Sequence, residues 1–134
     1  MSTNETMKYF DLHTQGLGYL NRIREVTPKE GTPFLSVTLA ALRGSVDNVQ
    51  YTHFECRVSG KQAQELVRKL KPAVEDSAKV LIGFTLSDLY AEAFTFKNGD
   101  KAGETGISLK ARLLRVAWAK VDGQPFYSAQ DNAA

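Results

Sequence analysis

The stretch YTHFECRVSGKQAQELVRKL (residues 51–70) decides the fold, because it contains a strand pattern followed directly by a helix pattern. Before Gly60 the apolar residues occupy every second position, as in a strand with one buried face: Phe54, Cys56 and Val58. After Gly60 they follow the spacing of a helix with one apolar face: Ala63, Leu66, Val67 and Leu70. We therefore predict a strand that ends near Gly60 and leads into a single amphipathic helix, whose frayed end lies at Pro72 because proline makes continuation of a helix costly.

Four further strands are predicted around this segment. Two precede it, GLGYLNRIREV (residues 16–26) and FLSVTLAAL (residues 34–42), and two follow it, AKVLIGFTLSDLYAEAFTF (residues 78–96) and ISLKARLLRVAWAKV (residues 107–121). Their alternation is interrupted at three places. The interruptions between Leu20 and Ile23 and at Leu113-Leu114 each predict a β-bulge, and the one near Ser87 and Asp88 indicates an irregularity. The connecting stretches TPKEGTP, RGSVDNVQ and KNGDKAGETG are typical of loops.

The predicted order is three strands, one helix and two more strands. Five curved antiparallel strands with one helix between the third and the fourth are the plan of the OB-fold. We therefore predict an all-β fold with one helix, a five-stranded OB-fold barrel that the helix closes at one end, with a long hairpin between the fourth and fifth strands. We expect one domain over residues 9–123, a flexible N-terminus at residues 1–8 and a loose tail at residues 124–134.

The composition limits the class of protein. A chain of 134 residues is sufficient for one domain with a real core. Its single cysteine excludes an internal disulfide and is typical of a reducing compartment. No apolar run approaches the roughly 20 residues that span a bilayer, and the first residues contain no apolar signal segment. We expect a cytoplasmic protein without membrane contact, whose net charge of +2 allows an anionic partner without requiring one.

These motifs resemble those of two groups of known proteins. The segment THFECRVSGKQAQELVRKLKPAVEDSAKVLIGFTL (residues 52–86) resembles the central part of bacterial single-stranded-DNA-binding proteins, in which an alternating strand, a Gly-Lys turn, a helix and an apolar strand follow one another. The whole chain, from YFDLHTQGLGYLNRI to GISLKARLLRVAW, is similar to a family encoded on bacterial integrative conjugative elements and labelled as replication proteins or as domains of unknown function.

The first resemblance implies a binding face. In those proteins the strand before the glycine lays its outward side chains against DNA, and the same register here points Tyr51, His53, Glu55, Arg57 and Ser59 outward. The implied phosphate contacts are Arg22, Arg24, Arg57, Lys61, Lys110 and Arg112, with Lys97 and Lys101 in the long hairpin. The implied base contacts are Tyr19, Tyr51, Phe94 and Phe96, together with His53, which stands where the resembled proteins usually have an aromatic ring.

Three departures from the resembled pattern change the expected balance of forces. His53 and Ser59 replace aromatic rings, and Glu55 adds a negative charge, so we expect charge to contribute more than stacking. Alternative interpretations stay open at this point. Either Phe94 or Phe96 belongs to the core, or both contact bases, and the basic residues either bind an anion or only face solvent. Trp118 is expected to pack against a terminal strand or a neighbouring subunit.

Enzymatic chemistry is not indicated. His13, His53 and Cys56 do not have the spacing of metal ligands, and Cys56 alternates with core residues. Gly16 and Gly18 lack the third glycine and the helix of a dinucleotide site. We predict no cofactor, no metal and no catalytic residue.

The predicted function is nucleic-acid binding. The expected ligand is single-stranded DNA, and the expected role is accessory to replication or transfer of a mobile element. The alternative is an adaptor that uses the same barrel to hold a replication or conjugation protein, with little or no DNA binding. We also expect a homo-oligomer, because exposed strand edges invite pairing.

Overall fold

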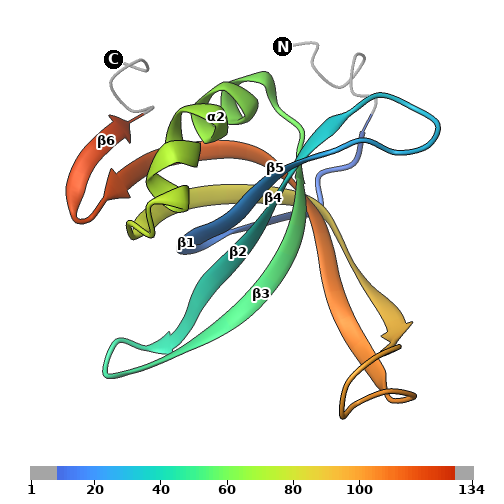
Figure 1. Ribbon diagram of the computed structural model, residues 1–134. Helices are drawn as coiled ribbons and strands as arrows, with labels where there is room; N and C mark the ends of the chain where they lie inside the picture. The colour runs from blue at the N-terminus through green and yellow to red at the C-terminus, as the bar shows by residue number, and fades with distance from the viewer. Residues whose placement is uncertain (1–8, 129–134) are drawn as a thin grey trace.

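The computed structural model describes residues 9–128 and contains six strands and one helix in this part of the chain. In chain order the elements are β1 (His13–Val26), β2 (Phe34–Ser45), β3 (Asn48–Val58), α2 (Lys61–Glu75), β4 (Val80–Thr95), β5 (Thr105–Val121) and β6 (Gln124–Ser128). Figure 1 shows the strands curling into a barrel below the helix. The expected flexible N-terminus at residues 1–8 lies outside the described residues.

The strands form one sheet in the order β3-β2-β1-β4-β5-β6. A parallel pairing of β3 with β5, from Phe54 opposite Leu109 to Val58 opposite Leu113, closes β1–β5 into a barrel. The other neighbouring strands pair antiparallel. This closed five-stranded barrel, with its helix between β3 and β4, confirms the predicted OB-fold plan.

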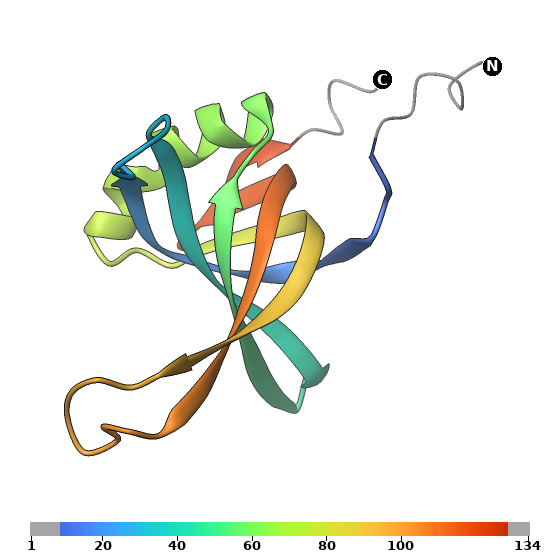
Figure 2. The same cartoon turned by 90° about the vertical axis from the view of Figure 1, so that its right-hand side faces the viewer.

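Alternate side chains of every barrel strand fill the interior. Those with almost no exposed surface include Leu20, Val37, Leu39, Cys56, Ile82, Leu86 and Leu113. α2 lies across one open end of the barrel (Figures 1 and 2) and buries the predicted apolar stripe, Ala63, Leu66, Val67 and Leu70. The buried side chains of the helix and of the strands belong to one hydrophobic core. Each large aliphatic side chain buried there stabilises the fold by about 1.5–3 kcal/mol, so this core holds the helix against the barrel.

Gly60 joins β3 to α2 at a point where the chain passes directly over β5. A Cβ atom at this position would overlap the carbonyl oxygen of Leu114. The neighbouring backbone is fixed by a hydrogen bond from Ser59 N–H to Leu113 O at 3.0 Å. Gln62 then donates to Val116 O and accepts from Val116 N–H, which ties the first turn of the helix to β5. Glycine is therefore needed here for close approach of two backbones.

Both predicted bulges are present, and the irregularity predicted near Ser87 is also a bulge. In β1 the register shifts between Asn21 and Arg24, and in β4 it shifts between Ser87 and Tyr90. The third lies in β5, where Leu114 has no partner in the register between β4 and β5. Because a bulge inserts one extra residue, the side chains beyond it exchange faces. Arg24 and Tyr90 therefore point away from the core.

Three expectations about the connections are wrong. The predicted loop at residues 43–50 is a β-hairpin, because β2 continues to Ser45 and β3 begins at Asn48. The predicted loose tail is wrong for Gln124–Ser128, which form β6 beside β5; residues 129–134 lie outside the described residues. The helix also continues past Pro72, where the sequence suggested its end, and stops at Glu75.

Two hairpins extend beyond the barrel at the end opposite α2 (Figures 1 and 2). We call them the β2–β3 arm (residues 42–53) and the β4–β5 arm (residues 89–108). They separate at Phe54 and Leu109, the last pair that joins β3 to β5 on this side. The space between the two arms is called the fork below.

Candidate nucleic-acid interface

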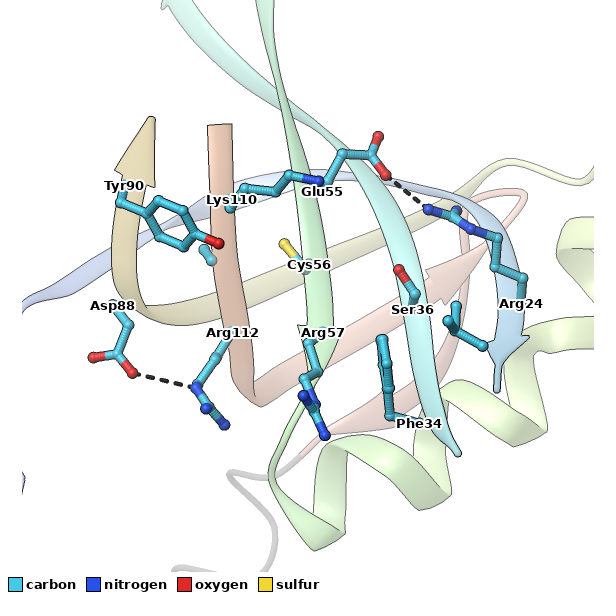
Figure 3. Close-up of a pocket in the computed structure, with 12 residues that line it drawn as sticks. Arg24, Phe34, Ser36, Glu55, Cys56, Arg57, Asp88, Tyr90, Lys110 and Arg112 are labelled. Carbon is cyan, nitrogen blue, oxygen red and sulfur yellow. Dashed lines mark hydrogen bonds and ion pairs between the residues drawn. The ribbon is translucent and has the colours of Figure 1, made fainter. Parts of the chain in front are cut away.

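A groove of about 440 Å³ crosses the outer face of the barrel over β1, β2, β3, β4 and β5. We call it the basic groove. Its lining residues are Arg24, Val26, Phe34, Ser36, Glu55, Cys56, Arg57, Asp88, Tyr90, Lys110, Ala111 and Arg112. Figure 3 shows the arginine side chains and Lys110 gathered along this surface, and they come from β1, β3 and β5. Four of the predicted phosphate contacts therefore meet in one place: Arg24, Arg57, Lys110 and Arg112.

The predicted alternation along β3 is confirmed. Phe54, Cys56 and Val58 are buried, whereas Arg57 is exposed and Glu55 is half-buried on the outer face. The strand registers align Arg24 with Ser36, Ser36 with Arg57, and Arg57 with Arg112. We call these four residues the arginine row. Because neighbouring strands lie about 4.8 Å apart, the row spans about 14 Å across the sheet.

Arg57 lies at the centre of the arginine row. Its guanidinium carbon is 4.2 Å from the centre of the Phe34 ring, which places the cation over an aromatic face. Within residues 9–128 it has no carboxylate at ion-pair distance. The neighbouring Arg112 faces it directly across the β3–β5 pairing.

The other three cations of the basic groove have acidic partners. Arg24 donates to Glu55 Oε1 at 2.9 Å, Arg112 lies 3.3 Å from Asp88 Oδ2, and Lys110 lies 3.8 Å from Glu92 Oε1. The Asp88 and Glu92 side chains are more than half exposed, at 62% and 55%. The groove therefore holds its cations in place with internal carboxylates, two of which are easily reached by solvent.

Glu55 is the most firmly held of these acids. One carboxylate oxygen accepts from Arg24 and the other accepts from the Thr38 hydroxyl at 2.9 Å. Partial burial raises the pKa of Glu55, but the hydrogen bonds from Arg24 and Thr38 and the charges of Arg24 and Arg22 outweigh this and keep the pKa below its ordinary value. Glu55 therefore stays ionised at neutral pH.

A second groove, of about 620 Å³, lies between the outer face of β1, β2 and β3 and the segment from Val74 to Val80 at the end of α2. We call it the aromatic groove, because it contains Tyr19, Tyr51 and His53. Arg22 and Lys79 supply two cations beside the rings. In the strand registers Tyr19 and His53 belong to one cross-strand row, and the row of Asn21, Thr38 and Glu55 separates them from the arginine row. Four more predicted residues are thus brought together, two rows away from Arg57.

The predicted rings of the long hairpin lie on the β4–β5 arm and outside the core. Phe94 and Phe96 contact each other edge to face, with ring centres 4.9 Å apart, and they pack over Gly106. Phe94 is 41% exposed, and Lys101 places its ammonium 5.7 Å from the Phe96 ring centre. Lys97 is also on this arm. The interpretation in which one of the two rings is a core residue is therefore wrong, because both stabilise the arm.

Sequence reasoning misplaced one residue and missed two. Lys61 is the first residue of α2 and lines neither groove, because the strand ends before it. Phe34 and Tyr90 line the basic groove but were not among the predicted contacts. Phe34 could have been found from the alternation of β2, which places it on the face of Ser36. Tyr90 could not, because its outward direction depends on the bulge at Asp88.

Other predicted features have simple structural positions. Cys56 is buried, and burial, together with the charge of Glu55, raises the pKa of its thiol to about 12. The Trp118 ring lies over Gly83 on the neighbouring strand β4, so it packs against the barrel's own sheet. Over residues 9–128 there is no group of three or more His, Cys, Asp or Glu side chains arranged to hold a metal. The helix in this part of the chain is too short and too polar to cross a membrane.

Comparison with known proteins identifies the family. The family model described as "Protein of unknown function (DUF3577)" matches residues 3–134, and the chain therefore belongs to this family. The searches of curated proteins and of solved structures found no match to this chain.

Proposed function

We propose that this DUF3577 protein is a binding protein and not an enzyme, and that it binds single-stranded DNA across the outer face of its barrel. The phosphates would lie along the arginine row, and bases would contact the rings beside it. The proposal rests on the side chains of the basic groove, which combine cations from three strands with two aromatic rings. Open barrel faces of this kind are a recurrent platform for oligonucleotides.

The observation that carries the proposal is the direct opposition of Arg57 and Arg112. Like charges on directly opposed residues of neighbouring strands destabilise a sheet. Asp88 pairs with Arg112 from an exposed position, whereas Arg57 lies over the Phe34 ring and, within residues 9–128, has no carboxylate at ion-pair distance. A phosphate placed between the two guanidinium groups would relieve this repulsion and could accept hydrogen bonds from both.

The ion pairs of the groove indicate which cations respond to DNA. Exposed pairs such as Arg112–Asp88 and Lys110–Glu92 contribute about 0–1 kcal/mol, so a phosphate can displace these carboxylates at little cost. The Arg24–Glu55 pair is shorter and is supported by Thr38. We therefore assign the phosphate contacts to Arg57, Arg112 and Lys110. Arg24 is excluded because its guanidinium group stays paired with Glu55.

Stacking supplies the second part of the proposed interaction. Phe34 and Tyr90 line the groove on either side of the arginine row, and Tyr90 is 56% exposed. A base stacked on an aromatic ring contributes about 1–3 kcal/mol. These two rings compensate for the platforms that His53 and Ser59 do not provide, so stacking contributes more than the sequence suggested.

The resemblance of the chain to proteins carried on integrative conjugative elements supports a role in replication or transfer of such an element, in the cytoplasm. That role agrees with a ligand that is transiently single-stranded.

The test is a titration of fluorescent oligothymidine at low and at moderate salt, read by anisotropy. Three phosphate contacts predict that log Kobs falls by about 2 for each log unit of salt, since each contributes about 0.7 on a single strand. Arg57→Ala and Arg112→Ala should each weaken binding and lower this slope by about 0.7. Lys69→Ala is the matched control, because it removes one exposed cation from α2 that lines neither groove. Equal effects of all three variants, or affinity independent of salt, would refute the proposal.

Glu55→Gln provides a variant with the opposite sign. It removes a negative charge from the groove and frees Arg24 for a fourth phosphate. Affinity at low salt should rise, and the slope should steepen by about 0.7. A variant that only damaged the fold would weaken binding, so an increase separates the electrostatic role of Glu55 from a structural one.

The alternative function is that of a protein-binding adaptor. It is favoured by the acids Glu55, Asp88 and Glu92, which leave the groove much less positive than its arginines suggest. The absence of binding to oligothymidine at both salt concentrations would favour this adaptor.

A further inference from the structure

The two arms leave four strand edges without a partner in the described part of the chain. β3 pairs with β5 only from Phe54 onward, so residues 48–53 have one free edge, and residues 105–108 of β5 have another. These two edges face the fork. On the outer sides of the arms, β2 pairs with β1 only up to Ala41 and β4 pairs with β1 only up to Ser87. Residues 42–45 and 89–95 therefore have free outer edges.

The edges that face the fork differ from the outer edges in charge. The β3 edge reads NVQYTH and the β5 edge reads TGIS, and neither contains Asp, Glu, Lys, Arg or Pro. The outer edges contain Arg43 on β2 and Glu92 on β4. Proteins usually protect a free edge with such charges or with proline, because an unprotected edge pairs with other chains. The fork edges lack this protection while remaining exposed, with Val49 at 39% and Tyr51 at 46%.

The chemistry of a free edge determines what can cover it. Backbone N–H and C=O groups alternate along the edge, and an extended polypeptide strand presents the complementary alternation. A nucleic acid does not. A groove of about 400 Å³ beside the edge provides space for such a strand, between Thr52 and His53 on one side and Ile107 and Ser108 on the other.

We propose that the β3 edges of two copies of this chain pair antiparallel, so that two β2–β3 arms form one four-stranded sheet. In an antiparallel two-fold pair only the residue on the axis lies opposite its own copy, and every other residue i lies opposite a residue j. We place the axis at Gln50, so that Val49 lies opposite Tyr51 and Asn48 opposite Thr52 of the second copy. None of these residues is Asp, Glu, Lys or Arg, so no like charges meet across the axis. The arm also projects away from the barrel (Figure 2), so the two barrels need not collide. Residues 48–52 therefore form the self-complementary edge that a two-fold pairing requires.

Gln50 lies on the proposed two-fold axis and gives a test that is independent of DNA binding. Its side chain alternates with Tyr51, so it shares a face with Thr52 and Phe54 and points away from both grooves. Gln50→Lys and Gln50→Glu each place a like charge opposite its copy in a two-fold pair. An equimolar mixture of the two variants instead brings opposite charges together.

The experiment is sedimentation equilibrium of the full chain without nucleic acid, from low micromolar concentration to the highest soluble concentration. Wild type should form dimers in a concentration-dependent way, and each single variant should dimerise roughly tenfold more weakly or worse. The mixture should recover the wild-type affinity. Val46→Lys is the control, because it adds the same charge at the exposed turn of the arm and not on the edge. Circular dichroism verifies that each variant is folded.

Three results would overturn the proposal. Wild type could remain monomeric at every concentration, the two Gln50 variants could dimerise like wild type, or the mixture could stay as weak as its components. None of these depends on whether the basic groove binds DNA, so failure of this proposal and failure of the proposed function are distinguishable.

Discussion

Glu55 shows how a single side chain is controlled by its neighbours on the outer face. Its two carboxylate oxygens accept hydrogen bonds from Arg24 and Thr38, so the ionised form is stabilised in the folded protein. In the unfolded chain these neighbours are lost and the pKa returns toward its ordinary value of 4.5. The pKa of Glu55 is therefore lower in the folded state than in the unfolded state, and its ionisation is linked to stability.

This linkage predicts the pH dependence of stability. A group with a lowered folded pKa stabilises the protein above its unfolded pKa, and this contribution is lost as the pH falls through the folded value. Wild type should thus exceed Glu55→Gln in free energy of unfolding by about 1 kcal/mol at neutral pH, and the difference should shrink as the pH drops below 4.5. Urea denaturation at a series of pH values measures it. A difference that stayed constant or grew toward acid pH would contradict the assigned environment.

The contacts of the basic groove differ in how far sequence could predict them. The outward direction of Arg57 followed from the period of two around Phe54, because both residues lie in an uninterrupted part of β3. Arg24 and Tyr90 depend on bulges, and a sequence can indicate that a bulge exists without fixing which residue it inserts. The ion pairs could not be predicted at all, because Glu55 meets Arg24 only after three strands have found their register.

At the scale of elements, β6 is the strand that the sequence pattern did not predict. It is short and contains Pro125, which is unusual inside a strand. It forms a strand because it pairs antiparallel with the end of β5, where Ala119 lies opposite Tyr127 and Trp118 opposite Ser128. Tyr127 packs against the core, whereas its neighbour Phe126 is 47% exposed.

This difference predicts unequal effects of two neighbouring substitutions. Tyr127→Ala should lower the free energy of unfolding by about 1–3 kcal/mol, because a half-buried ring is lost from the core. Phe126→Ala should change it by less than about 0.5 kcal/mol, because an exposed ring loses little. Chemical denaturation of both variants and wild type measures the two effects. Similar values for both would mean that β6 does not pack as a strand on β5.

The two arms show the opposite kind of error at this scale. Residues 43–50 were predicted as a loop because Gly, Ser, Asp and Asn are frequent there, yet they continue β2 and β3 around a tight turn. Turn residues predict that the chain reverses, but they do not say how far the strands extend on each side. The fork, and with it the free edges, therefore became visible only in three dimensions.

For the whole molecule, the barrel with α2 forms the stable unit and the arms extend from it. Every side chain of the buried core lies in the barrel strands or α2, and none comes from residues 96–104 at the tip of the β4–β5 arm. The turn at this tip is closed by local hydrogen bonds, including Phe96 N–H to Glu104 O at 2.9 Å and Gly103 N–H to Phe96 O at 2.8 Å. Folding and ligand binding can thus be separated by shortening the arm.

The corresponding variant replaces residues 97–103 by Asn-Gly, which favours a tight two-residue hairpin turn. The melting temperature, measured by circular dichroism, should stay within a few degrees of wild type, because no core side chain is removed. In a domain of this size a loss of about 1 kcal/mol would lower it by about 4 °C. Affinity for oligothymidine should fall, because Lys97 and Lys101 are removed from the side of the fork. Lys69→Ala is again the control, since the shortened arm also loses one net positive charge, two lysines and Asp100. If the shortened-arm variant binds oligothymidine as tightly as Lys69→Ala does, the arm contributes only its charge. If the variant binds more weakly than that control, the arm also positions the DNA strand against Phe94 and Phe96.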